Sequence, residues 1–355
     1  MEKIKIAVVG VGNISRCHIE SYIKNEKVEL YAFCDINEDR LKFMGEKYGV
    51  ERLYTDEKKM FEELPEIDAV SVCTWNNGHA PCAIMALENG KHVLCEKPMA
   101  MNAKQAEDML CAAKKAGKKL RIGFVRRFGR DAALTKELID NGRLGEIYYT
   151  KASYLRRNGN PGGWFGDKSR SGGGPLIDLG VHVIDLVRYL KGNPQPVSVY
   201  GATFTKLYDR ANIKTGRAYL ASSGMAEKPV CDVEDLASAL IRFEDGSVMQ
   251  VEASFSLNTG VTATGVSLFG DKAGVVIGSD VKMFTEMDGY LTNVEIEGDT
   301  GFDFGPAFDK EINAFVDDIL SPETDYSMAE DGIAIMKILD AIYESATTGH
   351  EVVIK

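Results

Sequence analysis

The sequence lacks basic clusters and long apolar runs, and each absence narrows the class of protein. Its 355 residues carry 42 lysines and arginines against 53 aspartates and glutamates, a net charge of −11. No run of basic residues exceeds three, which argues against nucleic acid or an anionic membrane surface as a partner. No apolar stretch approaches the ~18 residues of a membrane span. We therefore expect a small-molecule partner, with no nucleic acid and no membrane.

Paired cysteines are also missing. The seven cysteines are scattered and never form a Cys-x-x-Cys motif, which fits free thiols in a reducing compartment better than a disulfide framework or a zinc site. The N-terminal MEKIKIAVVG lacks the apolar core of a signal peptide and is typical of a strand. The sequence predicts a cytoplasmic protein without a metal site.

What is present indicates two domains. Up to about residue 125, short apolar runs alternate with helical segments, as in parallel strands covered on both faces. The helix expected at 102–116 has an Asn102 cap and ends at Gly117. Residues 1–125 are therefore predicted to form a doubly wound α/β domain of the Rossmann type. The strands expected are 4–10, 28–35, 68–74, 92–96 and 120–125.

The pattern changes after residue 125. Between 196 and 300, strand patterns follow one another with turns such as Asp245-Gly246 and no helices between them, which indicates a mostly antiparallel sheet. Helices are expected near 130–141, 308–320 and 328–347. Residues 126–355 are predicted to form an α+β domain, an open sheet with helices on one face, that binds substrate.

The stretch VVGVGNIS predicts a dinucleotide site. Gly10 and Gly12 lie between the first strand and a helix, where the first glycine makes the turn and the second lets a pyrophosphate approach the helix. Ser15 stands where a third glycine is usual. Asp35, at the end of the second strand, can accept hydrogen bonds from ribose hydroxyls and would repel a 2′-phosphate. It therefore favours NAD over NADP, although Arg40 lies near and weakens this preference.

The stretch GGGPLIDLGVHVIDLVRYL, residues 172–190, predicts a buried helix with its body at 176–190. At 100° per residue, Asp178, His182 and Asp185 fall within about 60° of one another. Gly180 leaves room there for a close approach. Because burying a charge costs several kcal/mol unless it is paired, this polar stripe needs either internal partners or a polar ligand.

Lys97 follows the strand 92–96 in the motif CEKP. The carboxyl ends of strands are where open α/β sheets bind ligands, and the following proline restricts the lysine's backbone. A lysine in this place can also be an ordinary solvated charge.

Several motifs together are similar to one known family. GVGNIS, CD at 34–35, TWNNGHAPCAIMALENGKHVLCEKP and GGGPLIDLGVHVIDL, in this order and spacing, resemble the Gfo/Idh/MocA family of NAD(P)-dependent sugar and cyclitol oxidoreductases. The similarity runs nearly end to end and includes YESATTGHEVVI near the C-terminus. Trp75 departs from it, since the family commonly has proline there.

The resemblance implies a set of site residues. Catalytic roles fall on Lys97, Asp178 and His182, with a cis Lys97–Pro98 bond and with Asp185 as a substrate contact. It also implies assembly into a homodimer or homotetramer through the open face of the second sheet. The residues it places around the cofactor, together with those of the glycine turn, are Gly10, Gly12, Asn13, Ile14, Asp35, Arg40, Thr74, Asn76, His79, Glu96, Lys97 and Arg127.

These residues suit oxidation of a secondary alcohol. An aspartate and a histidine four residues apart lie on one helix face, so the carboxylate can orient the imidazole that takes the hydroxyl proton. An ammonium at Lys97 would stabilise the developing alkoxide. A self-satisfied structural pair of Asp178 and His182 is the alternative. At the level of function, a redox-neutral NAD-dependent glycosidase and a non-catalytic nucleotide-dependent regulator are the alternatives.

Substrate contacts are also expected from a glycine-rich loop upstream of this helix. Arg156, Arg157, Asn158 and Asn160 flank Trp164 and Phe165. The loop can cover a sugar, with Trp164 against a ring, or the two aromatic side chains can form a hydrophobic plug that only holds the loop down.

Overall fold

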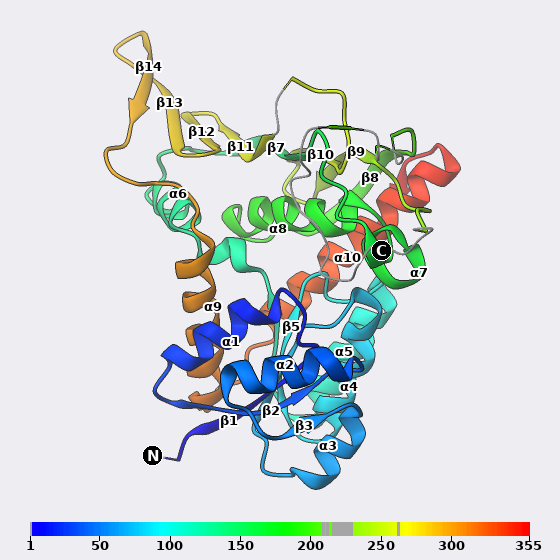
Figure 1. The fold of residues 1–355 in the computed structure, drawn as a ribbon. Coiled ribbons are helices and arrows are strands. Elements are labelled where there is room, and N and C mark those ends of the chain that lie inside the picture. The colour runs from blue at the N-terminus through cyan, green and yellow to red at the C-terminus, as the bar shows by residue number, and fades with distance from the viewer. Residues whose placement is uncertain (1, 208–209, 211–212, 215–229, 261–262) are drawn as a thin grey trace. The chain divides into compact units, whose positions relative to one another are not determined.

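The computed structural model describes residues 2–207, 210, 213–214, 230–260 and 263–355 (Figure 1). The chain forms two compact units. Unit 1 contains residues 1–124 and 308–336, and unit 2 contains residues 125–307 and 337–355. None of the described helices is both long enough and apolar enough to cross a membrane. The described residues also contain no group of three or more His, Cys, Asp or Glu side chains that could hold a metal ion.

Unit 1 is built on a six-stranded sheet whose described strands run in the order β3-β2-β1-β4-β5-β6. All five pairings between them are parallel, so the predicted doubly wound class is confirmed. The sequence pattern did not predict the shortest strand, β3. The strands are β1 (Ile4–Val9), β2 (Val28–Cys34), β3 (Leu53–Tyr54), β4 (Ala69–Val72), β5 (His92–Glu96) and β6 (Leu120–Gly123).

The helices of unit 1 begin and end where the sequence supplies caps. The Asn102 side chain accepts a hydrogen bond from the Gln105 N–H, and Gly117 ends the helix in the left-handed conformation, which confirms the predicted boundaries. Asn37 and Asp56 cap two further helices in the same way. The helices are α1 (Ser15–Lys24), α2 (Glu38–Tyr48), α3 (Glu57–Glu63), α4 (Asn76–Glu88) and α5 (Ala103–Ala116).

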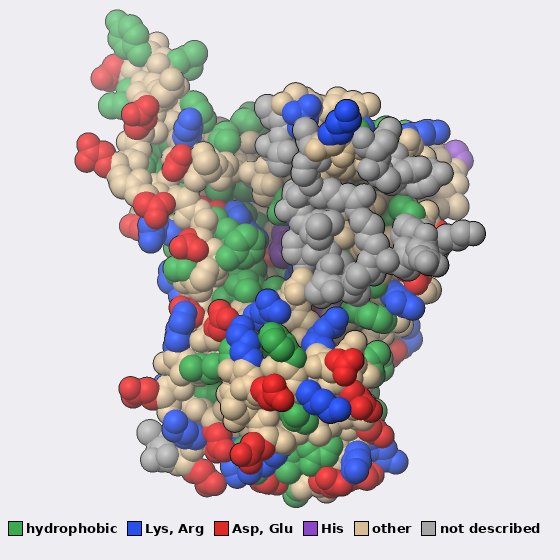
Figure 2. Space-filling model, in the orientation of Figure 1, with side chains coloured by type: hydrophobic (Ala, Val, Ile, Leu, Met, Phe, Trp, Pro, Cys, Tyr) green, Lys and Arg blue, Asp and Glu red, His purple; other side chains and the backbone are tan. Residues whose placement is uncertain are grey.

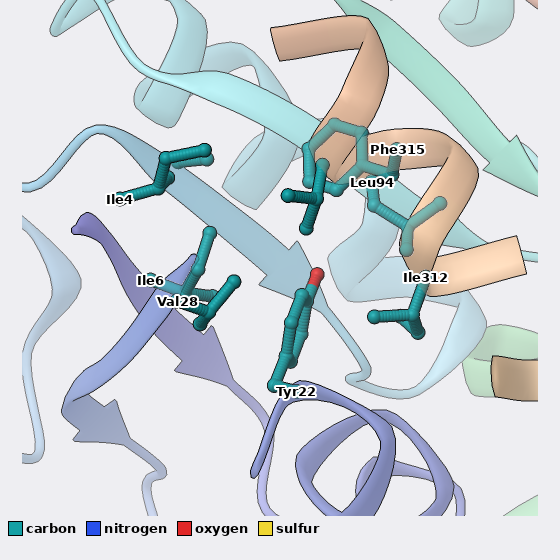
Figure 3. Close-up of a cluster of buried hydrophobic side chains, with 9 residues drawn as sticks. Ile4, Ile6, Tyr22, Val28, Leu94, Ile312 and Phe315 are labelled. Atoms are coloured by element: carbon teal, nitrogen blue, oxygen red, sulfur yellow. The ribbon is translucent and has the colours of Figure 1, made fainter. Parts of the chain in front are cut away.

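Part of the C-terminal region packs in unit 1. Helix α9 (Phe304–Leu320) places Ile312, Phe315 and Val316 against β-strand residues such as Ile4 and Leu94 in one buried cluster (Figure 3). Burying these side chains stabilises the packing of α9 in unit 1, since each apolar side chain removed from water contributes roughly 1.5–3 kcal/mol. The sequence analysis assigned 126–355 to a single domain, whereas residues 308–336 group with unit 1.

Unit 2 contains a nine-stranded sheet whose described strands run in the order β14-β13-β12-β11-β7-β10-β9-β8-β15. Only β7 and β10 pair in parallel among these described strands, so the prediction of a mostly antiparallel sheet is confirmed. The strands are β7 (Ile147–Leu155), β8 (Pro196–Phe204), β9 (Leu236–Phe243), β10 (Val248–Ser254), β11 (Ala263–Gly270), β12 (Ala273–Ile277), β13 (Val281–Met287), β14 (Tyr290–Glu295) and β15 (Val352–Val353).

The hairpin β13–β14 ends this sheet with an apolar tip. Met287, Tyr290 and Leu291 are exposed there, and Figure 2 shows hydrophobic side chains gathered at its end. The remaining helical segments of unit 2 lie between its strands or follow them; they are η1 (Val125–Phe128), α6 (Arg130–Asp140), η2 (Gly163–Gly166), α7 (Lys168–Ser171), η3 (Leu176–Gly180), α8 (Val181–Leu190) and α10 (Ser327–Thr348), the last of which begins in unit 1.

Candidate active site

The two glycines of the 10–12 turn differ in the space around them. Gly10 has φ +85°, and a Cβ added to it would lie 2.7 Å from the backbone of Cys73 and Thr74. A Cβ added to Gly12 would meet no atom within 4 Å. Gly10 is therefore required by the fold itself, whereas Gly12 leaves open space at the start of α1, where a phosphate group can approach backbone N–H groups.

Asp35 holds this turn in place. One carboxylate oxygen accepts the Val11 N–H at 2.8 Å, and the other accepts the Asn37 N–H at 2.8 Å. Each oxygen keeps a second lone pair, so the carboxylate can still accept ribose hydroxyls. Arg40 lies in the first turn of α2, where its N–H is bound by the Asn37 side chain.

Most of the other residues predicted around the cofactor lie at or just beyond the ends of β1, β4 and β5 in unit 1, whereas Arg127 lies in η1 of unit 2. Asn13 lies in the turn before α1, and Ile14 packs against an apolar cluster under that turn. Thr74 follows β4, and Asn76 begins α4 with its side chain buried. The structure thus brings these positions to one edge of the sheet, as the βαβ connectivity requires.

His79 connects two of these loops. Its Nδ1 lies 2.6 Å from the Pro98 carbonyl oxygen, and its Nε2 lies 3.2 Å from the Thr74 carbonyl oxygen. Burial lowers the pKa of His79, which favours a neutral ring with Nδ1–H donating to Pro98. The histidine ties the segment after β4 to the segment that carries Lys97.

Lys97 lies at the carboxyl end of β5, partly exposed, and its bond to Pro98 is cis, as predicted. Glu96, which the resemblance placed beside the cofactor, is buried. Its carboxylate bonds His18 at 2.8 Å and the Lys97 N–H at 3.1 Å. Glu96 therefore holds the backbone of Lys97 in place.

The first turn of the predicted helix in unit 2 is wider than expected. Residues 176–180 form the π-helix η3, and regular α-helix begins only at Val181. The Glu234 carboxylate lies at its start and accepts the Gly174 and Leu176 N–H groups at 2.9 and 3.1 Å. Single π-turns of this kind are frequent at functional sites.

Exposure along this helix singles out two side chains. Between Gly173 and Arg188, all of which the structure describes, Asp178 and His182 are the residues that are not buried. The backbone of Gly180 packs closely against strand β10, since a Cβ there would lie 3.2 Å from Leu176 and 3.5 Å from Ala253 on β10. The close approach expected at Gly180 is thus made by the protein's own strand.

Asp185 does not share the exposed face. Its carboxylate forms a buried ion pair with Arg127, whose Nη2 lies 2.6 Å away and whose Nε lies 3.0 and 3.1 Å from the two oxygens. The structure brings these two predicted residues together, although one was expected at the substrate and the other at the cofactor. Of the two explanations for the polar stripe, an internal partner therefore accounts for Asp185, whereas Asp178 and His182 are partly exposed and a polar ligand there stays a prediction.

His182 also lines a cavity of about 260 Å³ within unit 2. Phe302 and Phe304 supply aromatic faces, and the described lining contains no carboxylate. Arg126 lies over the Phe302 ring at 3.9 Å, and its guanidinium also bonds Asp131 at 2.6 Å. The full lining is Arg126, Tyr154, His182, Thr264, Gly278, Ser279, Phe302 and Phe304.

Most of this lining was missed by sequence reasoning. Arg126 directly precedes Arg127, the arginine that the resemblance places at the cofactor. The aromatic pair at 302 and 304 lies more than a hundred residues from His182, and a single sequence gives no sign that they meet.

The glycine-rich loop holds its own conformation. Trp164 stacks on Phe165 with ring centroids 4.0 Å apart, and both stay partly exposed. Arg156 bonds the Gly159 carbonyl, and the Asn160 side chain accepts the Gly162 N–H. Asn158 forms an isolated bridge with Ser256, and Arg157 is exposed, with its carbonyl bonded by Arg210.

Comparison with known proteins decides the family. Residues 4–124 match the oxidoreductase family with an NAD-binding Rossmann fold, and residues 133–276 match the GFO/IDH/MocA C-terminal domain. The chain is 34% identical to D-glucoside 3-dehydrogenase of Escherichia coli (strain K12), over 98% of this chain and 97% of that protein. The chain belongs to the Gfo/Idh/MocA family.

Further relatives agree with this assignment and confirm the resemblance. Myo-inositol 2-dehydrogenase of Thermotoga maritima is 29% identical over 93% of this chain and 92% of that protein. A structure of levoglucosan dehydrogenase in complex with NADH superposes with a TM-score of 0.85 and 25% identity, covering 100% of both chains. This chain is thus an oxidoreductase, and NAD is its cofactor.

The described residues fit NAD. The open space at Gly12 admits a pyrophosphate beside α1, and Asp35 offers lone pairs to ribose hydroxyls. NAD, when bound, accepts a hydride. The chain itself must orient the substrate and remove the hydroxyl proton.

Proposed function

We propose that this enzyme oxidises a ring secondary hydroxyl of a hexopyranose or its glycoside, with Lys97, Asp178 and His182 as the catalytic residues. The observation that carries the proposal is the partial exposure of Asp178 and His182 within the otherwise buried stretch Gly173–Arg188, with His182 at the cavity. Ligand pockets usually span about 300–1,000 Å³. A cavity of about 260 Å³, just below that range, suits one sugar ring better than an oligosaccharide.

The chemistry follows from these groups. The neutral imidazole of His182 takes the hydroxyl proton, while the Asp178 carboxylate favours the imidazolium that forms. The Lys97 ammonium stabilises negative charge on the substrate oxygen. In the cavity, Phe302 and Phe304 can pack on the apolar face of a ring.

The loop supplies the remaining contacts in this proposal. Trp164, stacked on Phe165 and partly exposed, covers the sugar, and Arg156 and Asn158 bind hydroxyls. Around NAD we place the same residues as the resemblance did, except that Glu96 and His79 act through the segments they hold, and Arg127 acts through its pair with Asp185.

We further propose a homo-oligomer that buries the open face of the unit 2 sheet. Tyr200 and Leu240 are exposed neighbours in register on β8 and β9. Tyr149 and Phe269 stack on the same face of β7 and β11. Light scattering should give a multiple of the 39.0 kDa chain mass, and a monomeric mass would contradict this part of the proposal.

One probe tests the proposed function against the glycosidase alternative. With p-nitrophenyl β-D-glucopyranoside and NAD, a dehydrogenase produces NADH and releases no nitrophenol. A redox-neutral glycosidase releases nitrophenol without net NADH. Methyl β-D-glucopyranoside, D-glucose and myo-inositol complete the panel. NAD reduction with myo-inositol alone, or with none of these compounds, would overturn the proposal.

A further inference from the structure

A chain of four buried polar side chains leads to Lys97 from inside unit 1. The Tyr22 hydroxyl lies 2.7 Å from Ser71 Oγ, which lies 3.2 Å from His18 Nδ1. His18 Nε2 lies 2.8 Å from Glu96 Oε1, and Glu96 Oε2 accepts the Lys97 N–H at 3.1 Å. Sequence analysis gave no role to His18, Ser71 or Tyr22, and the proposed mechanism does not use them.

The hydrogen bonds of this chain run in one direction. Burial raises the pKa of Tyr22, so its O–H donates to Ser71 Oγ, whose own O–H can donate to His18 Nδ1. The other ring nitrogen then carries the proton and donates to Glu96. With the Nε2–H donating to an ionised Glu96, each link pairs a donor with an acceptor.

Glu96 stays ionised although it is buried. Burial raises its pKa, but the hydrogen bond and the ion pairing of His18, followed by the positive charge of Lys97, more than compensate, so that the pKa is lowered overall. The backbone at Gly123 covers the carboxyl group, since a Cβ there would lie 3.3 Å from Glu96 Cδ. The Phe308 ring covers His18, with centroids 5.7 Å apart. Water is therefore excluded, and a charge there acts strongly on its neighbours.

We propose that His18 is a positioning residue for catalysis: it holds the Glu96 carboxylate ionised and directed at Lys97, which keeps the Lys97 side chain protonated and in place. This inference rests on the proposed role of Lys97. Lys97 is the partly exposed end of an otherwise buried chain, so the negative charge of Glu96 acts where the interior meets the ligand edge of the sheet. The other titratable groups around Glu96 are His79 on α4 and the thiols of Cys17, Cys73 and Cys95, with Glu311 of α9 near Tyr22 and Cys73.

The first arm of the test measures the Lys97 amine directly. The full-length protein, without cofactor, is labelled with trace acetic anhydride across a pH series, and Lys97 acetylation is followed by mass spectrometry. Glu96→Gln keeps the shape of the side chain but removes its charge. An ammonium releases its proton more easily when a nearby negative charge is removed. The Lys97 pKa should therefore fall by about one unit. An unchanged Lys97 pKa would overturn the inference.

The second arm separates positioning from stability. His18→Leu removes the donor to Glu96, whereas His18→Gln can still present an N–H to it. Single-turnover hydride transfer, normalised to NAD-binding sites, should fall about tenfold in His18→Leu and recover to within about threefold in His18→Gln, with the NAD Kd unchanged. Tyr22→Phe is the matched control: it removes a buried hydroxyl at the far end and should lower Tm without changing the Lys97 pKa.

The outcomes distinguish this inference from the proposed function. If Lys97→Ala keeps the wild-type rate, the proposed catalytic role fails, and the His18 inference fails with it. If Lys97→Ala is inactive while His18→Leu transfers hydride at the wild-type rate, only the inference about His18 is overturned.

Discussion

The two glycines of the 10–12 turn have different roles: the fold requires one of them, and the other leaves space for a ligand. Gly10 occupies a position that no L side chain can adopt without meeting the Cys73 backbone, whereas Gly12 has open space around it. Asp35 likewise binds the turn and keeps lone pairs for a ligand. In this Gly-x-Gly motif the first glycine is needed for folding and the second leaves space for the cofactor. Substituting each glycine in turn can therefore distinguish the two roles.

Gly10→Ala and Gly12→Ala form a matched pair. Gly10→Ala should destabilise the protein by about 1–3 kcal/mol or more, because it adds a strained backbone and a steric clash. Gly12→Ala should leave stability within about 0.5 kcal/mol and weaken NAD binding, because the added methyl group fills the space reserved for the cofactor. Urea unfolding and NAD titration of both variants check this. Equal effects on stability would show that the two glycines do not differ.

The buried pair of Arg127 and Asp185 is a second residue-scale test. Removing one partner should cost about 3–5 kcal/mol of unfolding free energy because the other charge stays buried. Asp185→Leu combined with Arg127→Met should recover much of that loss. Urea unfolding of the two single variants and the double variant measures the coupling. A single Asp185→Asn variant with native stability but a strongly raised KM would instead support direct substrate binding by Asp185.

At the scale of elements, local signals predicted some segments well and others incompletely. Asn102 and Gly117 fixed the ends of α5 because capping depends on residues within one turn. The π-turn at 176–180 was not predictable, because apolar periodicity does not distinguish it from the first turn of an α-helix. Its cap, Glu234, lies 58 residues further along the chain.

Removing this cap tests how the π-turn is held. In Glu234→Ala, two buried N–H groups lose their acceptor, which should cost about 1–3 kcal/mol each. Tyr343→Phe removes one hydroxyl that donates to Glu234 at 2.9 Å and should cost only about 0.5–1.5 kcal/mol. Hydrogen exchange at Leu176 should accelerate in the alanine variant alone. Unchanged protection there would show that Glu234 does not hold the turn.

At the scale of the whole molecule, the sequence predicted both types of sheet. It did not predict that residues 308–336 belong to unit 1 and residues 337–355 to unit 2. Periodicity reports that 308–320 is helical and amphipathic, yet the apolar face of a helix does not indicate which core it joins. Ile312 and Phe315 join the core of unit 1. The pairing of Arg127 with Asp185 was not predicted for a similar reason, because the two residues are 58 positions apart and nothing local links them.

The central claim is that three residues, contributed by both units, are catalytic. Lys97 belongs to unit 1, and Asp178 and His182 belong to unit 2. The alternative, a structural pair of Asp178 and His182, makes a different prediction: substitution would lower stability, and activity would fall only with the amount of folded protein.

The most direct measurement is single-turnover hydride transfer on the glycoside that the substrate panel identifies, with thermal unfolding and NAD titration on the same samples of Lys97→Ala, His182→Gln and Asp178→Asn. Lys97→Ala and His182→Gln should each slow transfer by roughly 10²–10⁴-fold while Tm and the NAD Kd stay close to native values. Asp178→Asn should slow it as well, because the charge that orients the imidazole is lost. Folded Lys97→Ala and His182→Gln variants that transfer hydride at near-native rates would contradict the account.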